Sequence, residues 1–195
     1  MSIARACVAG QISSNVRRIE VISAHPLAND WEVEMQTRAF DAMYIPANDT
    51  PWFPYGGSGC EVQLIQADPT TGHWIAKLRG PAGGNLGIHR HYGSVLGLTL
   101  RGAWRYLEHD WISRPGDIVH ETPGSVHTLV LQDDSEIIFF VEGALEYLDS
   151  DGHTLAHEDW RSITDKHVAF CAERGLDIVD VARPRAMTDE RVTVA

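Results

Sequence analysis

Two histidines separated by a single residue, His89 and His91, lie in the segment GIHRHYGSVLGLTLRG, residues 87–102. The segment has the aliphatic residues and bounding glycines of a β-strand followed by a turn. Successive side chains of a strand point to opposite faces, so both imidazoles point the same way. Imidazole nitrogen is a common ligand of transition metals, and two imidazoles on one face of a strand can bind the same ion. The spacing therefore predicts part of a metal site.

A third ligand is expected from the segment GDIVHETPGSVHT, residues 116–128. Here the turn residues Pro123 and Gly124 redirect the chain, and His127 follows at the start of another predicted strand. Because a turn fixes the direction of the backbone, His127 can be held rigidly against the first pair. The chain contains ten histidines, so one HxH pair carries little weight alone. Its position after a glycine-rich turn, with His127 after a second turn, predicts a site of His89, His91 and His127.

The elements that position these residues are predicted to be strands. From Pro51 onward, turn clusters such as DPTTG and SRPGD separate short segments rich in aliphatic and aromatic residues, namely EVQLIQA, HWIAKLR, LGIHRHY, SVLGLTLR, AWRYLEHDWIS, DIVHE, HTLVLQ and EIIFFVEG. This spacing predicts an all-β sandwich or barrel. One C-terminal helix of about three turns is expected in SITDKHVAFCAERG, with Ser162 as the N-cap and Gly175 as the C-cap. The predicted organisation is an N-terminal arm at 1–48, a barrel at 49–149, and a helix and tail packing on the barrel at 150–195.

Composition excludes several classes of partner. A net charge of −11 leaves no basic stripe for nucleic acid or an anionic membrane surface. The three cysteines are scattered without a CxxC pair, which is typical of free thiols in a reducing compartment. No apolar segment has the pattern of a secretory signal or the length of a membrane span. We therefore expect a cytoplasmic protein that binds no nucleic acid and no membrane.

The two histidine motifs resemble those of the cupin superfamily. The first motif runs from Gly83 through His89 and His91 to Gly102, and the second runs from Gly116 through Pro123 and Gly124 to His127. The resemblance implies a single-domain cupin, that is, a double-stranded β-helix or jelly-roll barrel. Cupins commonly have a glutamate a few residues after HxH as a fourth ligand. Val95 occupies that position here, and no acidic residue lies between His91 and Gly102, which leaves a three-histidine site.

A narrower resemblance extends from about Trp52 to Gly175. The segments GIHRHYGSVLGLTLRGAWRYLEHDW and RPGDIVHETPGSVHTL, the YLDSDG turn and the helix ending CAERGL are similar to the bacterial 2,4'-dihydroxyacetophenone dioxygenases. A more distant resemblance is to the acetylacetone-cleaving dioxygenase. The resemblance implies a non-haem Fe(II) centre that uses O2 to cleave an aromatic α-hydroxyketone between its carbonyl and hydroxymethyl carbons. The products would be 4-hydroxybenzoate and formate.

Three further residues are candidates for contact with substrate. Glu121 lies six residues before His127 and could orient substrate or accept a proton; the alternative is a carboxylate at the rim that binds the Pro-Gly turn. Trp104, Tyr106 and Glu108 share one face of a predicted strand. If that face points inward, Tyr106 and Glu108 contact substrate and Trp104 walls the pocket. The alternative is that the aromatic residues belong to the barrel core.

The chemistry of the ligands leaves other functions open. Three histidines also suit Zn²⁺ with an activated water, and Mn or Ni could take the place of iron. A metal-dependent lyase, isomerase or hydrolase, or a non-catalytic metal-bound sensor, is therefore an alternative to the dioxygenase. The sheet edges of a small barrel are often covered by a second subunit, so a homodimer or homotetramer is expected.

Overall fold

The computed structural model describes residues 44–56 and 58–182. Almost all of the predicted arm at 1–48 and the end of the predicted tail lie outside these residues. The three-part organisation inferred from the sequence therefore stays a prediction. Within the described part, the chain forms eleven strands followed by one helix.

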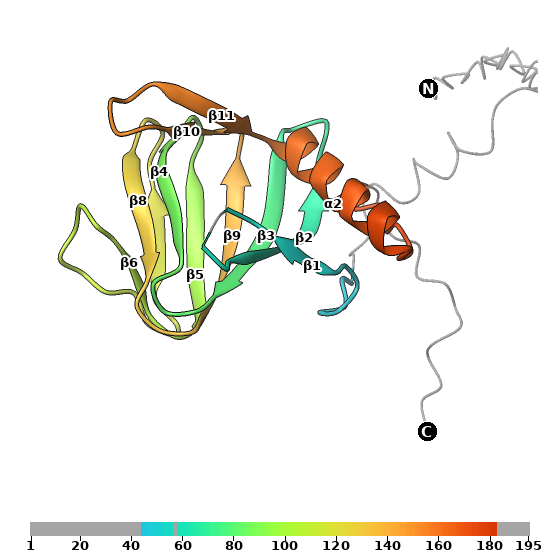
Figure 1. Cartoon of the computed structure of the whole chain (residues 1–195), viewed down its shortest axis with the longest axis horizontal. Helices are drawn as coiled ribbons and strands as arrows, with labels where there is room; N and C mark the ends of the chain where they lie inside the picture. The colour runs from blue at the N-terminus through green and yellow to red at the C-terminus, as the bar shows by residue number, and fades with distance from the viewer. Residues whose placement is uncertain (1–43, 57, 183–195) are drawn as a thin grey trace, which may run out of the picture. The chain divides into compact units, whose positions relative to one another are not determined.

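The strands form two antiparallel sheets (Figure 1). The six-stranded sheet has the order β1-β2-β3-β9-β5-β7, and the five-stranded sheet has the order β11-β10-β4-β8-β6. The first sheet contains β1 (Trp52–Pro54), β2 (Glu61–Ala67), β3 (His73–Gly80), β9 (Ser135–Glu142), β5 (Val95–Arg101) and β7 (Ile118–Glu121). The second contains β11 (Thr154–Glu158), β10 (Leu145–Leu148), β4 (Asn85–His91), β8 (Val126–Leu131) and β6 (Trp104–Tyr106). The all-β prediction is confirmed.

The core lies between the two sheets, because alternate residues of each strand point inward. The six-stranded sheet contributes Leu64, Leu78 and Ile137, and the five-stranded sheet contributes Trp104 and Leu129, each at most 2% exposed. Trp104 also connects the sheets, since its indole Nε1–H donates to Thr99 Oγ1 on β5 at 2.7 Å. The two described cysteines, Cys60 and Cys171, are free and buried.

One segment is less extended than its composition indicates. AWRYLEHDWIS forms only the three-residue strand β6, and a turn begins at Leu107. The remainder is part of the loop that leads to β7, which Figure 1 shows projecting beyond the sheets. The alternation of faces expected along the whole segment therefore ends at Tyr106.

The C-terminal helix α2 spans Trp160–Arg174. The predicted N-cap, Ser162, is wrong: Asp159 is the N-cap, and its side chain accepts from the backbone N–H groups of Arg161 and Ser162. Ser162 is instead residue N3, and its Oγ accepts from the backbone N–H of Asp159 at 2.8 Å, which completes a capping box. The predicted C-cap is confirmed, since Gly175 adopts the left-handed conformation with φ 64°.

Candidate metal centre

Strand pairing brings the three predicted histidines together. His89 on β4 lies directly opposite His127 on β8, and His91 follows two residues along the same face of β4. The Pro-Gly turn is anchored to the end of β4, because Gly124 N–H donates to His91 O at 2.7 Å and His91 N–H donates to Ser125 O at 3.1 Å. Gly124 has φ 85°, a conformation that glycine adopts without strain. The turn thus fixes the register that places His127 opposite His89.

The three imidazoles point at one place. His89, His91 and His127 are 4%, 3% and 3% exposed, and each offers a ring nitrogen within 4.8 Å of those of the others. The Nε2 atoms of His91 and His127 are 3.0 Å apart. The Nδ1 atom of His89 lies 3.0 Å from Gly87 O, to which it can donate, and this leaves Nε2 of His89 as the ligand atom.

This geometry fits a metal ion. Ligand nitrogens about 2.1 Å from a metal and at right angles to each other lie about 3.0 Å apart. Burial, reinforced by the neighbouring imidazoles of His91 and His127, lowers the pKa of His89 to about 4, so its ring is neutral at pH 7, as a ligand must be. A buried carboxylate oxygen, Glu121 Oε2, lies beside these rings, 2.7 Å from His91 Nε2. An ion bound by the three histidines would lie close to this carboxylate.

Glu121 reaches the histidines from the other sheet. It ends β7, where it pairs with Val95 of β5, the residue at the position of the usual cupin glutamate. Its Oε2 atom lies 2.7 Å from His91 Nε2 and 3.4 Å from His127 Nε2. Burial alone would raise the pKa of Glu121, but the adjacent imidazoles of His127 and His91 outweigh it and lower the pKa to about 2. The sequence shows that position 95 lacks an acid; the fold supplies one from the neighbouring strand.

Tyr106 holds Glu121 in place. Its hydroxyl donates to Glu121 Oε1, and its ring stacks on His127 with centroids 3.6 Å apart and planes at 12°. Burial, together with the charge of Glu121, raises the pKa of Tyr106 well above its usual value, so the phenol remains a donor. The buried Trp104 packs edge-to-face against Tyr106, with ring centroids 5.3 Å apart. Tyr106 thus contacts both a predicted ligand and the carboxylate beside it.

Glu108 lies away from the site. It is exposed, and its carboxylate accepts from the backbone N–H and the hydroxyl of Thr128, both at 2.9 Å. It shares no face with Tyr106 because β6 ends before it. The structure therefore brings together five of the six predicted site residues and leaves Glu108 outside.

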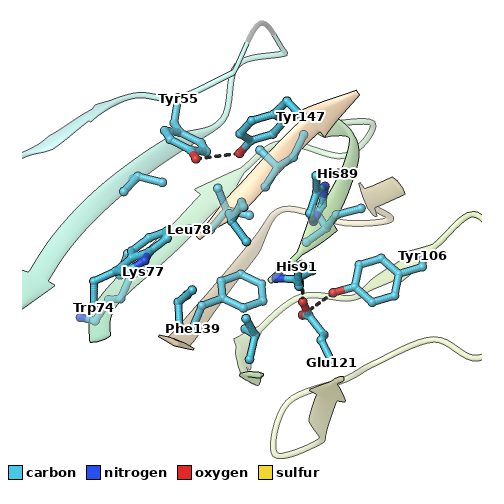
Figure 2. A pocket seen from close by; sticks show the side chains of 17 residues that line it. Tyr55, Trp74, Lys77, Leu78, His89, His91, Tyr106, Glu121, Phe139 and Tyr147 are labelled. Carbon is cyan, nitrogen blue, oxygen red and sulfur yellow. Dashed lines mark hydrogen bonds and ion pairs between the residues drawn. The ribbon is translucent and has the colours of Figure 1, made fainter. Parts of the chain in front are cut away.

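A cavity of about 50 Å³ opens on the inner side of the histidines, enough for several water molecules. Its walls are mainly apolar, with Trp74, Leu78 and Phe139 among the lining residues. Figure 2 shows polar groups at two ends of this space: Glu121 with Tyr106 beside His91, and the hydroxyls of Tyr55 and Tyr147 across the cavity. A second, open cleft of about 570 Å³ reaches Tyr106, Glu121 and His127 from outside. Tyr106 and Glu121 therefore lie between a mainly apolar cavity and a cleft that is open to solvent.

Tyr55 and Tyr147 were not singled out from the sequence. Tyr147 on β10 pairs with His89 on β4, and their ring centroids are 5.8 Å apart. The sequence signal for Tyr147 was weak, since YLDSDG has the composition of a turn and β10 contains only four residues.

A second group of side chains close enough together to bind a metal lies in that turn and consists of Asp149, Asp151 and His153. Asp149 already accepts from two backbone N–H groups of the turn.

These observations define a class. An HxH strand paired with a strand that carries a third histidine after a Pro-Gly turn, inside a barrel of two antiparallel sheets, is the arrangement of a cupin. Within that superfamily, residues 41–146 match the family model described as the ChrR cupin-like domain, and the chain belongs to this family. The predicted cupin assignment is confirmed, and the histidine set suits a transition metal.

Solved structures have the same fold. An RmlC-like cupin from Ralstonia eutropha JMP134 is 32% identical, with 77% of this chain and 100% of that chain covered and a TM-score of 0.70. An acetylacetone dioxygenase from Acinetobacter johnsonii is 21% identical over 66% of this chain and 91% of that chain, with a TM-score of 0.60. A putative acetylacetone dioxygenase from Methylibium petroleiphilum PM1 is 19% identical over 65% and 94%, with a TM-score of 0.61. At this identity, the two dioxygenases support the fold alone. No curated protein matches the sequence significantly.

The described residues include no helix with the length and apolar character required to cross a membrane.

Proposed function

We propose that this cupin is a non-haem Fe(II) dioxygenase that cleaves an aromatic α-hydroxyketone, 2,4'-dihydroxyacetophenone. The bond between the carbonyl and hydroxymethyl carbons breaks, and O2 supplies one oxygen atom to each fragment. The products are 4-hydroxybenzoate and formate, and no other oxidant or reductant is required. The proposed ligands are His89, His91 and His127.

The observation that carries the proposal is the position of two of the three histidines, His89 and His91, on the wall of a mainly apolar cavity. Neutral imidazoles leave the charge of a divalent ion only partly offset, by Glu121, in a buried space where its attraction for an anionic oxygen is strong. The bound metal would supply the site for the two substrate oxygens and for O2. The apolar walls would exclude bulk water from the reacting carbons.

Glu121 is proposed as the proton acceptor. Its lowered pKa keeps it ionised at neutral pH, and it lies beside the ring nitrogens where the substrate's hydroxyketone group would bind. The Tyr106 hydroxyl, which donates to Glu121 Oε1, leaves Oε2 to accept a proton from the hydroxymethyl group. Tyr106 is therefore a positioning residue, and Glu108 has no role in this proposal.

The test is substrate turnover by iron-loaded protein. Oxygen uptake and formate release in equal amounts with 2,4'-dihydroxyacetophenone are expected. His89→Ala and His127→Ala should bind no stoichiometric iron, whereas His73→Ala, a control at an exposed histidine on β3, should bind iron normally. Iron-loaded protein that neither consumes O2 nor releases formate would refute the proposed reaction.

Glu121 also favours a second candidate. Three histidines and a carboxylate suit Zn²⁺ or Mn²⁺ as well as Fe²⁺, so a metal-dependent hydrolase, isomerase or lyase fits the same ligands. Metal analysis of protein purified without added metal separates the two candidates. Stoichiometric zinc that iron cannot replace would favour the second.

A further inference from the structure

A chain of buried polar groups leads from helix α2 to the cavity. Glu158, at the end of β11, has no exposed surface. Its carboxylate accepts hydrogen bonds from Ser162 Oγ and Lys166 Nζ on α2 and, at 3.2 Å, from the hydroxyl of Tyr55. The Tyr55 hydroxyl in turn lies 2.7 Å from that of Tyr147. The chain therefore ends at a phenol that lines the cavity.

The direction of these hydrogen bonds follows from the carboxylate. An ionised carboxylate only accepts, so the Tyr55 hydroxyl proton is committed to Glu158. A hydroxyl has one proton, so Tyr55 can offer only its oxygen to the other phenol. Tyr147 must then donate its own proton to Tyr55. The order of donation is Tyr147 to Tyr55 to Glu158.

This order determines what Tyr147 can offer a ligand. Its proton is used, and the only hydrogen bond recorded for its oxygen, among residues 44–56 and 58–182, is the one to Tyr55. The oxygen keeps a lone pair, so it can accept but not donate. Burial raises the pKa of Tyr147, and burial with the neighbouring Tyr147 and Glu158 raises that of Tyr55, so both phenols keep their protons.

From this polarity we infer that Tyr147 is a specificity-determining residue that accepts a hydrogen bond from an O–H or N–H group on the distal end of the ligand. The inference rests on the proposed function, because that function places the hydroxyketone of the substrate at the histidines and its other end toward Tyr147. Tyr147 lies beside His89, whereas Glu121 lies beside His91, so the two polar ends of the cavity are distinct (Figure 2). For the substrate class of the proposed function, an aryl hydroxyketone, the group that Tyr147 would bind is a hydroxyl in the para position.

The same contacts would also hold α2 against the barrel, and a purely structural role predicts no ligand preference. Para-substituted acetophenones separate the two, because they lack the hydroxymethyl group and are not cleaved. Binding to metal-loaded protein without O2 is measured by calorimetry. The para-hydroxy and para-amino compounds can donate, the para-methyl compound is of similar size without a polar group, and the para-methoxy compound can only accept.

The wild-type protein should bind the two donors about tenfold more tightly than the methyl compound, as a neutral hydrogen bond in an enclosed site allows. Tyr147→Phe should reduce this difference to about twofold or less. Tyr55→Phe provides the sharper test, because it removes the acceptor of the Tyr147 proton. Tyr147 can then donate, and binding of the methoxy compound should improve relative to the methyl compound. A loss of fold stability alone would not invert a preference.

Equal affinity for donors and the methyl compound in wild-type protein would overturn the inference, as would an absence of saturable binding by 4-hydroxyacetophenone. An unchanged preference in Tyr147→Phe would also overturn it. The proposed function fails separately: iron-loaded protein would then not cleave 2,4'-dihydroxyacetophenone although the donor preference persists. Cleavage with no difference between substrates with and without the para-hydroxyl would refute the role of Tyr147 alone.

Discussion

Glu121→Gln tests whether the carboxylate from β7 contributes to metal binding. The substitution keeps the size of the side chain and its ability to accept a hydrogen bond from Tyr106, but it removes the charge. Oε2 lies 2.7 Å and 3.4 Å from the Nε2 atoms of His91 and His127, so an ion bound by these nitrogens would lie close to the carboxylate. We expect the affinity for divalent metal to fall.

The size of the effect follows from distance and burial. A carboxylate about 4 Å from a divalent ion interacts with it by about 8 kcal/mol at an effective dielectric constant of about 20, and this gross Coulomb energy exceeds the net effect of neutralising the carboxylate. Loss of a residue next to metal ligands typically lowers metal affinity by about 10-fold to 100-fold, or about 1.4 to 2.7 kcal/mol. Because Glu121 is only 4% exposed, water screens it poorly. The expected loss is therefore near 100-fold.

Competition with a chromophoric chelator measures the affinity of wild type and variant for Zn²⁺ and Fe²⁺. Glu108→Gln is the matched control, since it makes the same change at an exposed carboxylate bound to Thr128. A second variant, Val95→Glu in the Glu121→Gln background, returns a carboxylate from the paired position on β5 and should recover at least about tenfold of the lost affinity. An affinity of Glu121→Gln within about twofold of wild type would refute the role of the carboxylate.

Three further outcomes follow from local structure. Asp159→Ala removes the N-cap of α2 and should lower the free energy of unfolding, measured in urea, by about 1 kcal/mol; no change would mean that Ser162 suffices. Gly102→Ala should destabilise the fold more than Gly72→Ala. Both glycines have φ near 78°, but only at Gly102 would an added Cβ overlap a backbone oxygen, that of Asp134. Equal shifts of the melting temperature in the two variants would refute this steric argument. In a spectrophotometric titration, three phenols should stay protonated above about pH 10 while the chain stays folded, and stability should fall there because the folded chain retains phenol protons that the unfolded chain loses. The three that stay protonated are Tyr55, Tyr106 and Tyr147.

Local pattern was sufficient for the histidines. Alternation along one strand places His89 and His91 on the same face, and a turn of two residues fixes the start of the strand whose second residue is His127. The strands were also predictable where turn residues bound them, as for EVQLIQA, which coincides with β2. In each case the determining interaction lies within a few residues of the chain.

The remainder of the site depends on pairing between distant segments. Glu121 acts beside Val95 only because β7 adds to the edge of β5, and no local period encodes that partner. The Tyr55–Tyr147 pair joins β10 to the residue that follows β1, across most of the described chain. The prediction for Glu108 is wrong for a local reason: the alternation of faces holds only along β6, and the chain turns after Tyr106.

The proposed metal ligands and the carboxylate come from different sheets, and this makes the site dependent on how the sheets pack. His89, His91 and His127 lie on β4 and β8 of the five-stranded sheet, whereas Glu121 lies on β7 of the other. The strand β6 connects them, because Trp104 donates to Thr99 on β5 and Tyr106 donates to Glu121 on β7. A change in the core beneath β6 would therefore move the carboxylate relative to the imidazoles without altering any ligand. The fully buried Trp104, through its hydrogen bond to Thr99, joins the sheet that carries the imidazoles to the sheet that carries the carboxylate.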